Sequence, residues 1–371
     1  MGTRISDRKA RAQRPHLRDG ETTMKGVAFL AVVLALLLLL EIVSPGGVGM
    51  ADLTFEVFTL SVVVRIGIFS IIVVGLNILM GFAGQVSLGQ GAFFGIGAYT
   101  TAVFTARGDV FGLDQGLIDA WWWPWILMAI GAVAAGLLAY VIGRPLLQLK
   151  GHYLAMGTLG FGIVVFILFR ENFGLQLSSI NVTGGFDGIS DVPRIAIGSF
   201  TLWPVERFYV LVWVIALGVI YLGHNIVRPR FGRALKAIRG SELAAGVMGV
   251  DVTHLKAQTF AVSAVFASVA GSLFAHFQAA VSPTPFDFLV SVQLVIMAAL
   301  GGASTIWGAP LGVAIVLGLE EILRSRLRLF VEGSGTEFEP VVFGISLIAL
   351  MIFLPDGLAP RIKRLLDRRK T

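Results

Sequence analysis

Apolar residues in this chain are gathered into runs that approach the length needed to cross a lipid bilayer. The hydrocarbon core of a bilayer is about 30 Å thick, so a spanning helix needs roughly 20 apolar residues. We expect ten such segments, at 27–44, 57–78, 86–106, 125–143, 152–170, 208–225, 257–280, 288–303, 308–323 and 340–355. The third, eighth and ninth are short or rich in glycine, and we expect some of them to be broken or re-entrant.

Composition agrees with a lipid environment for most of these residues. Hydrophobic residues make up 56% of the chain and charged residues only 14%, whereas a soluble domain carries about 25% charged residues. Lipid offers no hydrogen bonds to the backbone, so apolar spans of this length form α-helices, which satisfy their own backbone groups. The sequence therefore predicts an all-α polytopic membrane protein with about 8–10 transmembrane helices.

The basic residues are concentrated in three regions that we expect on one side of the membrane. Of 29 Lys and Arg residues, seven lie in 1–26, six in 226–256 and six after residue 355. The positive-inside rule places all three in the cytoplasm. We therefore expect a basic cytoplasmic N-terminal tail at 1–26, a transmembrane domain at 27–355 with a cytoplasmic loop at 226–256, and a basic cytoplasmic tail at 356–371. The net charge of +6 is explained by topology, so no nucleic acid is expected as a partner.

The first apolar run has an alternative interpretation. A basic stretch followed by the short run 27–40 is also typical of a secretory signal. No small-x-small cleavage site follows it directly. We therefore expect a retained membrane anchor.

The sequence lacks the common signatures of catalysis. It has no Gly-Lys dipeptide and hence no phosphate-binding loop, no HExxH and no GxSxG. Cysteine is absent, and the five histidines have no metal-ligand spacing. We expect no enzyme activity, no metal site and no cofactor in this chain.

Ionisable residues are scarce inside the predicted spans. Arg65 lies within the second span, where it could contact an anionic group of a substrate or pair with a neighbouring helix. Glu320, Glu321 and His276 are expected near span ends. Proton-coupled carriers place titrating groups deep in the bilayer, so this pattern weighs against a secondary carrier.

The cytoplasmic loop contains a predicted short helix. Ser241 is a favoured N-cap, Glu242 suits the positive end of a helix dipole, and Gly249 suits the position after a helix end. A helix of about two turns is too short to be stable alone. It must therefore dock, either on the chain's own helix ends or on a partner protein, while its basic flanks also fit lipid headgroups.

The residues of this helix resemble a known motif. Glu242-x-Ala244-Ala245-x-x-x-Gly249 is similar to the EAA-x-x-x-G loop of ATP-binding-cassette (ABC) importer permeases, although the I-x-LP element further downstream is absent. In that family the loop forms a cytoplasmic coupling helix that inserts into a groove of the ATPase subunit. The resemblance implies an ATPase-coupling role for Arg239, Ser241, Glu242, Leu243, Ala244, Ala245 and Gly249.

Further stretches point to one branch of that family. They run in the family's order and cover about residues 60 to 360: Gly75–Tyr99, Thr183–Ile189, Val281–Pro283 with Phe286, Leu300–Gly302 with Gly308, and Leu354–Leu358. On these motifs the chain is identified as a member of the LivH/LivM family of branched-chain amino acid permeases, and it resembles the LivM type.

The resemblance implies a function and a set of partners. We expect a permease subunit that imports leucine, isoleucine and valine across the inner (plasma) membrane. Expected partners are a sister LivH-type permease, two ABC ATPase subunits that bind ATP and Mg, a periplasmic or extracellular substrate-binding protein, and membrane lipid. A related importer of urea, amides or other amino acids is the main alternative, and a secondary carrier or a membrane scaffold is less favoured.

Glycines and polar side chains coincide in the segment 81–97. Glycine-interrupted apolar segments are where transporters break helices to face a cavity. The expected pathway residues are Asn77, Gln85, Ser87 and Gln90, together with Thr183, Gly184 and Gly185 in an outer turn. For each residue taken alone, a hydrogen bond between helices or an inert turn explains it equally simply.

The predicted topology is open to a direct test in this cysteine-free chain. Cysteines placed singly at His16, Lys236 and Leu365 should react with a membrane-impermeant thiol reagent from the cytoplasmic face of oriented vesicles. A cysteine at Asp114, in a predicted outer connection, should react from the opposite face. Labelling of the first three positions from different faces would show that the count of spans is wrong.

Overall fold

The structure is a computed structural model of the 371-residue chain. It describes residues 60–149, 151–172, 182–198, 200–228, 230–330, 343–348, 351–352 and 357–359. The span predicted at 27–44 and the tail predicted at 1–26 lie outside these residues. Only parts of the span predicted at 340–355 and of the C-terminal tail lie within them.

Five helices in the described part of the chain are long and apolar enough to cross a membrane. They are α3 with the π-helix η1 (Leu60–Phe82), α6 (Trp123–Leu146), α7 (His152–Arg170), α9 (Val205–Val227) and α12 (Val252–Gln278). Three further helices correspond to the predicted third, eighth and ninth spans: α4 (Gln90–Ala106), α13 (Phe288–Gly301) and α14 (Ala309–Phe330). The all-α polytopic class predicted from the sequence is confirmed.

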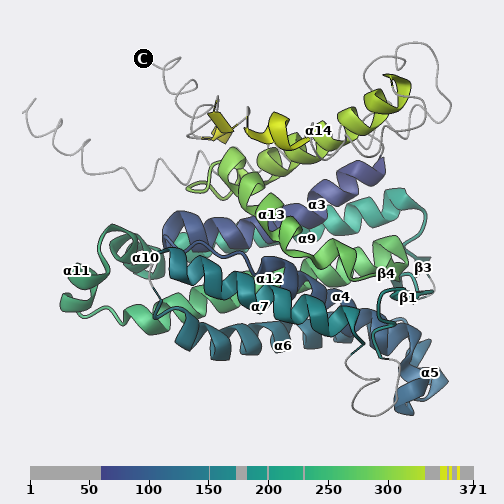
Figure 1. Cartoon of the computed structure of the whole chain (residues 1–371). Helices are drawn as coiled ribbons and strands as arrows, with labels where there is room; N and C mark the ends of the chain where they lie inside the picture. Colours follow the sequence, from purple (N-terminus) through teal and green to yellow (C-terminus); the bar gives the residue numbers. More distant parts are fainter. Residues whose placement is uncertain are drawn as a thin grey trace, which may run out of the picture. The chain divides into compact units, whose positions relative to one another are not determined.

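Short elements lie at the two ends of the helix bundle (Figure 1). At one end are α10 (Arg230–Gly240) and α11 (Glu242–Val247). At the other end are α5 (Gln115–Ile118) and two small antiparallel pairs, β1 (Ile189–Ser190) with β4 (Ala280–Val281) and β2 (Ala196–Ile197) with β3 (Phe200–Thr201). Ile189 lies opposite Val281, and Ala196 lies opposite Thr201. There are also two 3₁₀ turns, η2 (Gly108–Phe111) and η3 (Thr284–Phe286), and residues 343–348 are helical.

Helix α12 is the packing centre of the bundle. It packs most extensively against α4 and α6, and also against α3. A Cβ atom on Gly271 would lie 1.9 Å from the Phe94 carbonyl oxygen, and one on Gly97 would lie 2.0 Å from the Ser268 carbonyl oxygen. These glycines allow the backbones of α4 and α12 to touch, which is the close approach that small residues permit between membrane helices.

The chain is not helical between η1 and α4, at the start of the third predicted span, whose remainder forms the continuous helix α4. Helix α3 continues into η1 (Asn77–Phe82), residues 83–89 are not helical, and α4 begins at Gln90. Gly84 has a φ of +69°, a conformation that glycine adopts without strain. The span expected from residue 86 therefore starts four residues later, and the irregular segment precedes it.

Helix α14 is longer than the ninth predicted span. It continues past residue 323 to Phe330, so Glu320 lies in the middle of a 22-residue helix, and its place near the end of a membrane span stays a prediction. The apolar pattern ends early because Glu320, Glu321 and Arg324 follow in succession, whereas the helix continues through these good helix formers. Glu320 instead has a partner on another helix, described below.

The contact between α4 and α12 predicts a contrast between two glycine substitutions. Gly271→Ala should lower the free energy of unfolding by about 1–3 kcal/mol, because the added methyl group cannot fit without moving a backbone. Gly218→Ala, on α9 where no atom lies within 4 Å of the added Cβ, should be neutral or stabilising by up to about 1 kcal/mol. Thermal unfolding of the purified protein in detergent measures both. Equal melting temperatures for the two variants would contradict the close contact.

Candidate functional site

Helices α10 and α11 form a compact hairpin at one end of the bundle. Buried Leu235 and Ile238 attach α10 to the bundle. Ser241 has an extended backbone, and its Oγ accepts a hydrogen bond of 3.2 Å from the Ala244 amide. Gly249 has a φ of +85°. Ser241 is therefore the N-cap, as predicted. Gly249 follows the end of the helix in the left-handed conformation, which agrees with its predicted position.

The six-residue helix α11 presents apolar side chains outward. The exposed fractions of Leu243, Val247 and Met248 are 79%, 89% and 83%, whereas Ala245 is only 3% exposed. Only one side of α11 therefore packs on the described part of the chain. The sequence left open whether this helix docks on its own chain or on a partner, and its outward face lies uncovered by any described residue.

An ion pair fixes the start of α11 to the central helix. The Lys256 ammonium group, near the start of α12, donates to the Glu242 carboxylate. The Lys256 side chain is 4% exposed and that of Glu242 is 41% exposed. Sequence reasoning placed Glu242 at the helix N-terminus correctly but counted Lys256 only as a topology charge. The signal it missed was a lysine that continues the apolar face of α12.

A second polar link joins α10 to the broken segment. The Arg239 guanidinium group donates to the carbonyl oxygen of Gly81 in η1. Three residues earlier, the Lys236 ammonium group lies 5.7 Å from the centre of the Phe82 ring. The structure thus brings Arg239, assigned to coupling by resemblance, next to the segment assigned to the pathway.

The predicted pathway residues between 77 and 90 are all buried. Asn77 Nδ2 donates to the Thr305 carbonyl oxygen at 2.9 Å, and Ser87 Oγ accepts from the Gly89 amide at 3.4 Å. Within the described part of the chain, both side-chain amide atoms of Gln85 and of Gln90 lack a hydrogen-bond partner. One buried amide with unused donors and acceptors therefore lies within the non-helical segment, and a second lies at the first residue of α4.

Side chains from two other helices hold this segment in place. Thr158 Oγ1 on α7 accepts from the Leu88 amide at 3.0 Å, and Ser291 Oγ on α13 accepts from the Gly91 amide at 2.9 Å. Both hydroxyls are buried. Nothing in the sequence singles out Thr158 or Ser291. Each is a hydroxyl residue in an otherwise apolar helix, but the sequence alone does not show which backbone group such a residue faces.

The turn at 183–185, predicted to lie outside, is apart from the 77–90 segment. Thr183 Oγ1 donates to the Phe169 carbonyl oxygen at 2.8 Å, and the Thr183 amide donates to Asn172 Oδ1 at 3.1 Å. Gly184 and Gly185 have φ values of +77° and +60°. The turn leads into β1, at the end of the bundle opposite α11 (Figure 1). A pocket of about 480 Å³ at that end is lined in part by Thr105, Asp119, Asp191 and Arg194.

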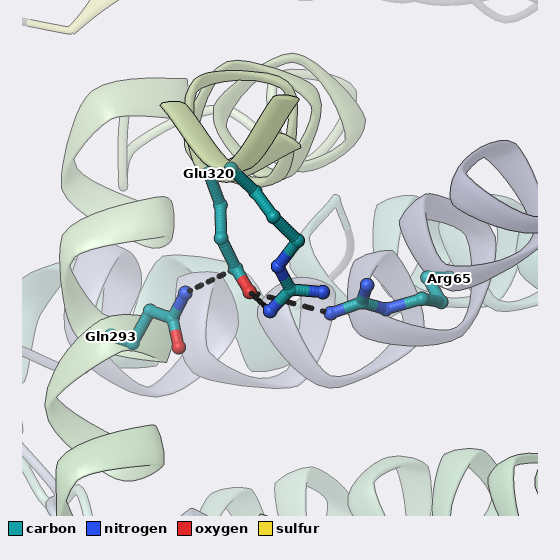
Figure 2. A network of polar contacts seen from close by, with 4 residues as sticks. Arg65, Gln293 and Glu320 are labelled. Atoms are coloured by element: carbon teal, nitrogen blue, oxygen red, sulfur yellow. Dashed lines mark hydrogen bonds and ion pairs between the residues drawn. The ribbon is translucent and has the colours of Figure 1, made fainter. Parts of the chain in front are cut away.

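Arg65 pairs with a neighbouring helix, which is one of the two roles left open for it. Figure 2 shows Arg65 on α3 and Gln293 on α13 converging on Glu320 of α14. Arg65 Nη2 lies 3.7 Å from Glu320 Oε1, and Gln293 Nε2 donates to Glu320 Oε2 at 3.4 Å. Arg324 Nη2 lies 3.6 Å from the same carboxylate. One carboxylate thus joins three helices that include the broken span.

Sequence comparisons find relatives along most of the chain. A family model described as the permease component of a branched-chain amino acid transport system matches residues 58–352. The high-affinity branched-chain amino acid transport system permease protein LivM of Salmonella typhimurium is 29% identical, over 92% of this chain and 76% of LivM. Escherichia coli LivM is 28% identical over the same shares. Escherichia coli LivH is 25% identical, over 79% of this chain and 91% of LivH. No solved structure matches the chain.

The pair between Lys256 and Glu242 predicts a non-additive effect on stability. Glu242→Gln should lower the free energy of unfolding by about 1–3 kcal/mol, because it leaves a buried ammonium group without its carboxylate; the partial exposure of Glu242 keeps the cost below that of a fully buried pair. Adding Lys256→Met should restore part of this loss. Thermal unfolding of the two single variants and the double variant forms the test. Additive effects would show that the pair contributes nothing.

Proposed function

The chain belongs to the family of branched-chain amino acid transport permeases, and we propose that it is a permease subunit of an ABC importer. In this role it forms, with a sister LivH-type permease, the translocation pathway for leucine, isoleucine and valine across the inner (plasma) membrane. The family match over residues 58–352 and the similarity to LivM and LivH support this proposal.

The observation that carries the proposal is the outward apolar face of α11. Leu243 and Val247 lie on this six-residue helix, and Met248 is its C-cap residue. A helix this short is marginal in water and needs contacts outside itself to be stable. An apolar helix face of this kind fits a groove on a partner protein. We propose that the groove belongs to an ABC ATPase subunit.

The partner ATPases supply the chemistry that this chain lacks. In the proposed complex two ATPase subunits bind ATP and Mg and hydrolyse ATP, and a periplasmic or extracellular binding protein delivers the amino acid. The loop at 226–256 and both tails then lie in the cytoplasm, where the positive-inside rule expects their basic residues.

The buried amides of the broken segment support a pathway role. A zwitterionic amino acid carries a carboxylate, which needs hydrogen-bond donors, and an ammonium group, which needs acceptors. Gln85 and Gln90 each offer both kinds of atom, and Asn77 Oδ1 is a further acceptor without a partner among the described residues. Burying such groups unpaired costs free energy, which a passing solute offsets. Thr183, Gly184 and Gly185 take a role at the outer mouth in this scheme.

The docking role of α11 predicts a selective loss of the ATPase subunits. Leu243→Asp and Val247→Asp place a charge in the proposed contact, and each should weaken copurification of the ATPases by about tenfold or more, as expected for buried anchors of an interface. Val110→Asp is the matched control, because Val110 is also exposed but lies in η2. ATP-dependent leucine uptake by vesicles that contain the whole complex should fall in parallel.

Three outcomes would overturn parts of the proposal. If no ATPase copurifies with the unchanged chain, the ABC assignment is wrong. Uptake that follows an ion gradient and needs no ATP would indicate a secondary carrier. Uptake of urea or an amide in place of leucine, isoleucine and valine would leave the ABC assignment intact and correct the substrate.

A further inference from the structure

The break after η1 leaves the Gly81 carbonyl without its helical partner. In a continuous α-helix the Gln85 amide would donate to the carbonyl of Gly81, four residues earlier. Here the Gln85 amide donates to Leu79, six residues earlier, at 3.1 Å. The Gly81 carbonyl instead accepts from the Arg239 guanidinium group. A side chain of α10 therefore caps the interrupted helix, which is one way in which orphan carbonyls at helix ends are satisfied.

The non-helical segment after η1 lies directly against the aliphatic part of the Arg239 side chain. A Cβ atom on Gly84 would lie 3.2 Å from Arg239 Cγ, and the positive φ of Gly84 turns the chain at this point. Lys236, three residues before Arg239 on the same face of α10, lies over the Phe82 ring. Helix α10 thus holds η1 and the start of the non-helical segment through two cationic side chains.

The opposite side of η1 rests on the connection between α13 and α14. A Cβ atom on Gly81 would lie 1.7 Å from the Ala303 carbonyl oxygen, so the two backbones are in direct contact. Asn77 Nδ2 holds the Thr305 carbonyl in the same connection. The end of the broken span is therefore enclosed between α10 and this connection, and a shift of α10 relative to α13 and α14 must act on η1.

We propose that Arg239 is the positioning residue through which the α10–α11 hairpin controls the segment 77–89. Arg239 is bonded to the Gly81 carbonyl, so a displacement of the hairpin moves η1. This movement changes the access of solute to Gln85, Ser87 and Gln90. An arginine suits this task because its charged, planar guanidinium group makes stronger and more directed hydrogen bonds to an oxygen than a neutral donor does. This inference rests on the proposed function, since it assumes that a partner ATPase moves α11.

A single cysteine can report the movement in the whole complex. Val86 lies within the non-helical segment and is partly exposed, so Val86→Cys in the cysteine-free chain provides one thiol for labelling. The complex of this chain with its sister permease, ATPases and binding protein is reconstituted in vesicles. Thiol-labelling rate, ATP hydrolysis and leucine uptake are each measured with and without ATP, and the Val86→Cys complex is the reference for all variants.

Three substitutions in this background separate positioning from charge and from assembly. Arg239→Met removes the guanidinium group, Arg239→Lys keeps a charge with a different geometry, and Arg233→Met removes an exposed charge from the same helix. We expect Arg239→Met to reduce both the ATP-dependent change in labelling rate and the uptake by about tenfold or more, the effect of losing a charged hydrogen bond. ATP hydrolysis should persist and thus become uncoupled from uptake. Arg239→Lys should give an intermediate response, and Arg233→Met should match the reference.

The outcomes distinguish this inference from the function on which it rests. If the reference complex transports leucine with ATP and Arg239→Met responds as the reference does, the inference is wrong and the proposed function stands. If the reference complex shows no ATP-dependent uptake, the proposed function fails and the inference fails with it. Should Arg239→Met not assemble, Arg239→Lys decides: a reduced labelling response in an assembled complex supports the inference, and an unchanged response overturns it.

Discussion

A bilayer offers no water to backbone groups, so every break in a membrane helix must be satisfied by the protein itself. This constraint governs the described part of the chain, because the helix that begins at Leu60 ends at Phe82 and the next one, α4, begins only at Gln90. The backbone groups near this break form hydrogen bonds with side chains of other helices. Thr158 and Ser291 accept from amides at the C-terminal side of the break, and Arg239 donates to a carbonyl at its N-terminal side. Side chains from three other helices thus support the irregular segment.

The packing around α12 stabilises the part of the chain that follows the irregular segment. Helices α4 and α12 touch backbone to backbone at Gly97 and Gly271, so the part of the chain after the break has a rigid neighbour. Helix α12 also carries Lys256 at its start, and this buried ammonium group holds α11 through Glu242. Helix α12 therefore holds α4 through apolar and backbone contacts. It holds α11 through the ion pair between Lys256 and Glu242.

Local features of the fold could be predicted from the sequence, whereas pairings between helices could not. Most of the described helices, the N-cap at Ser241 and the left-handed Gly249 follow from periodicity and capping, because these depend on neighbouring residues. The partners of Lys256, Arg239 and Arg65 depend on how each helix is rotated and tilted, which side-chain packing decides. The length of α14 is a related case. The apolar pattern ends close to Glu320, whereas the helix continues to Phe330 and Glu320 pairs with Arg65 of another helix.

The two attachments of the α10–α11 hairpin differ from the packing of the bundle in a way that suits a moving part. Interlocked apolar surfaces such as the α4–α12 contact resist small displacements, because close-packed interiors transmit strain and do not deform continuously. The hairpin buries few large side chains, among them Leu235 and Ile238. Its polar links to η1 are made by Arg239 and Lys236, and its polar link to α12 is made by Lys256. A long, flexible side chain can maintain its polar contact while the helix that carries it shifts. Such links can therefore carry a displacement from the hairpin into the bundle without disturbing the core that keeps the broken segment in place.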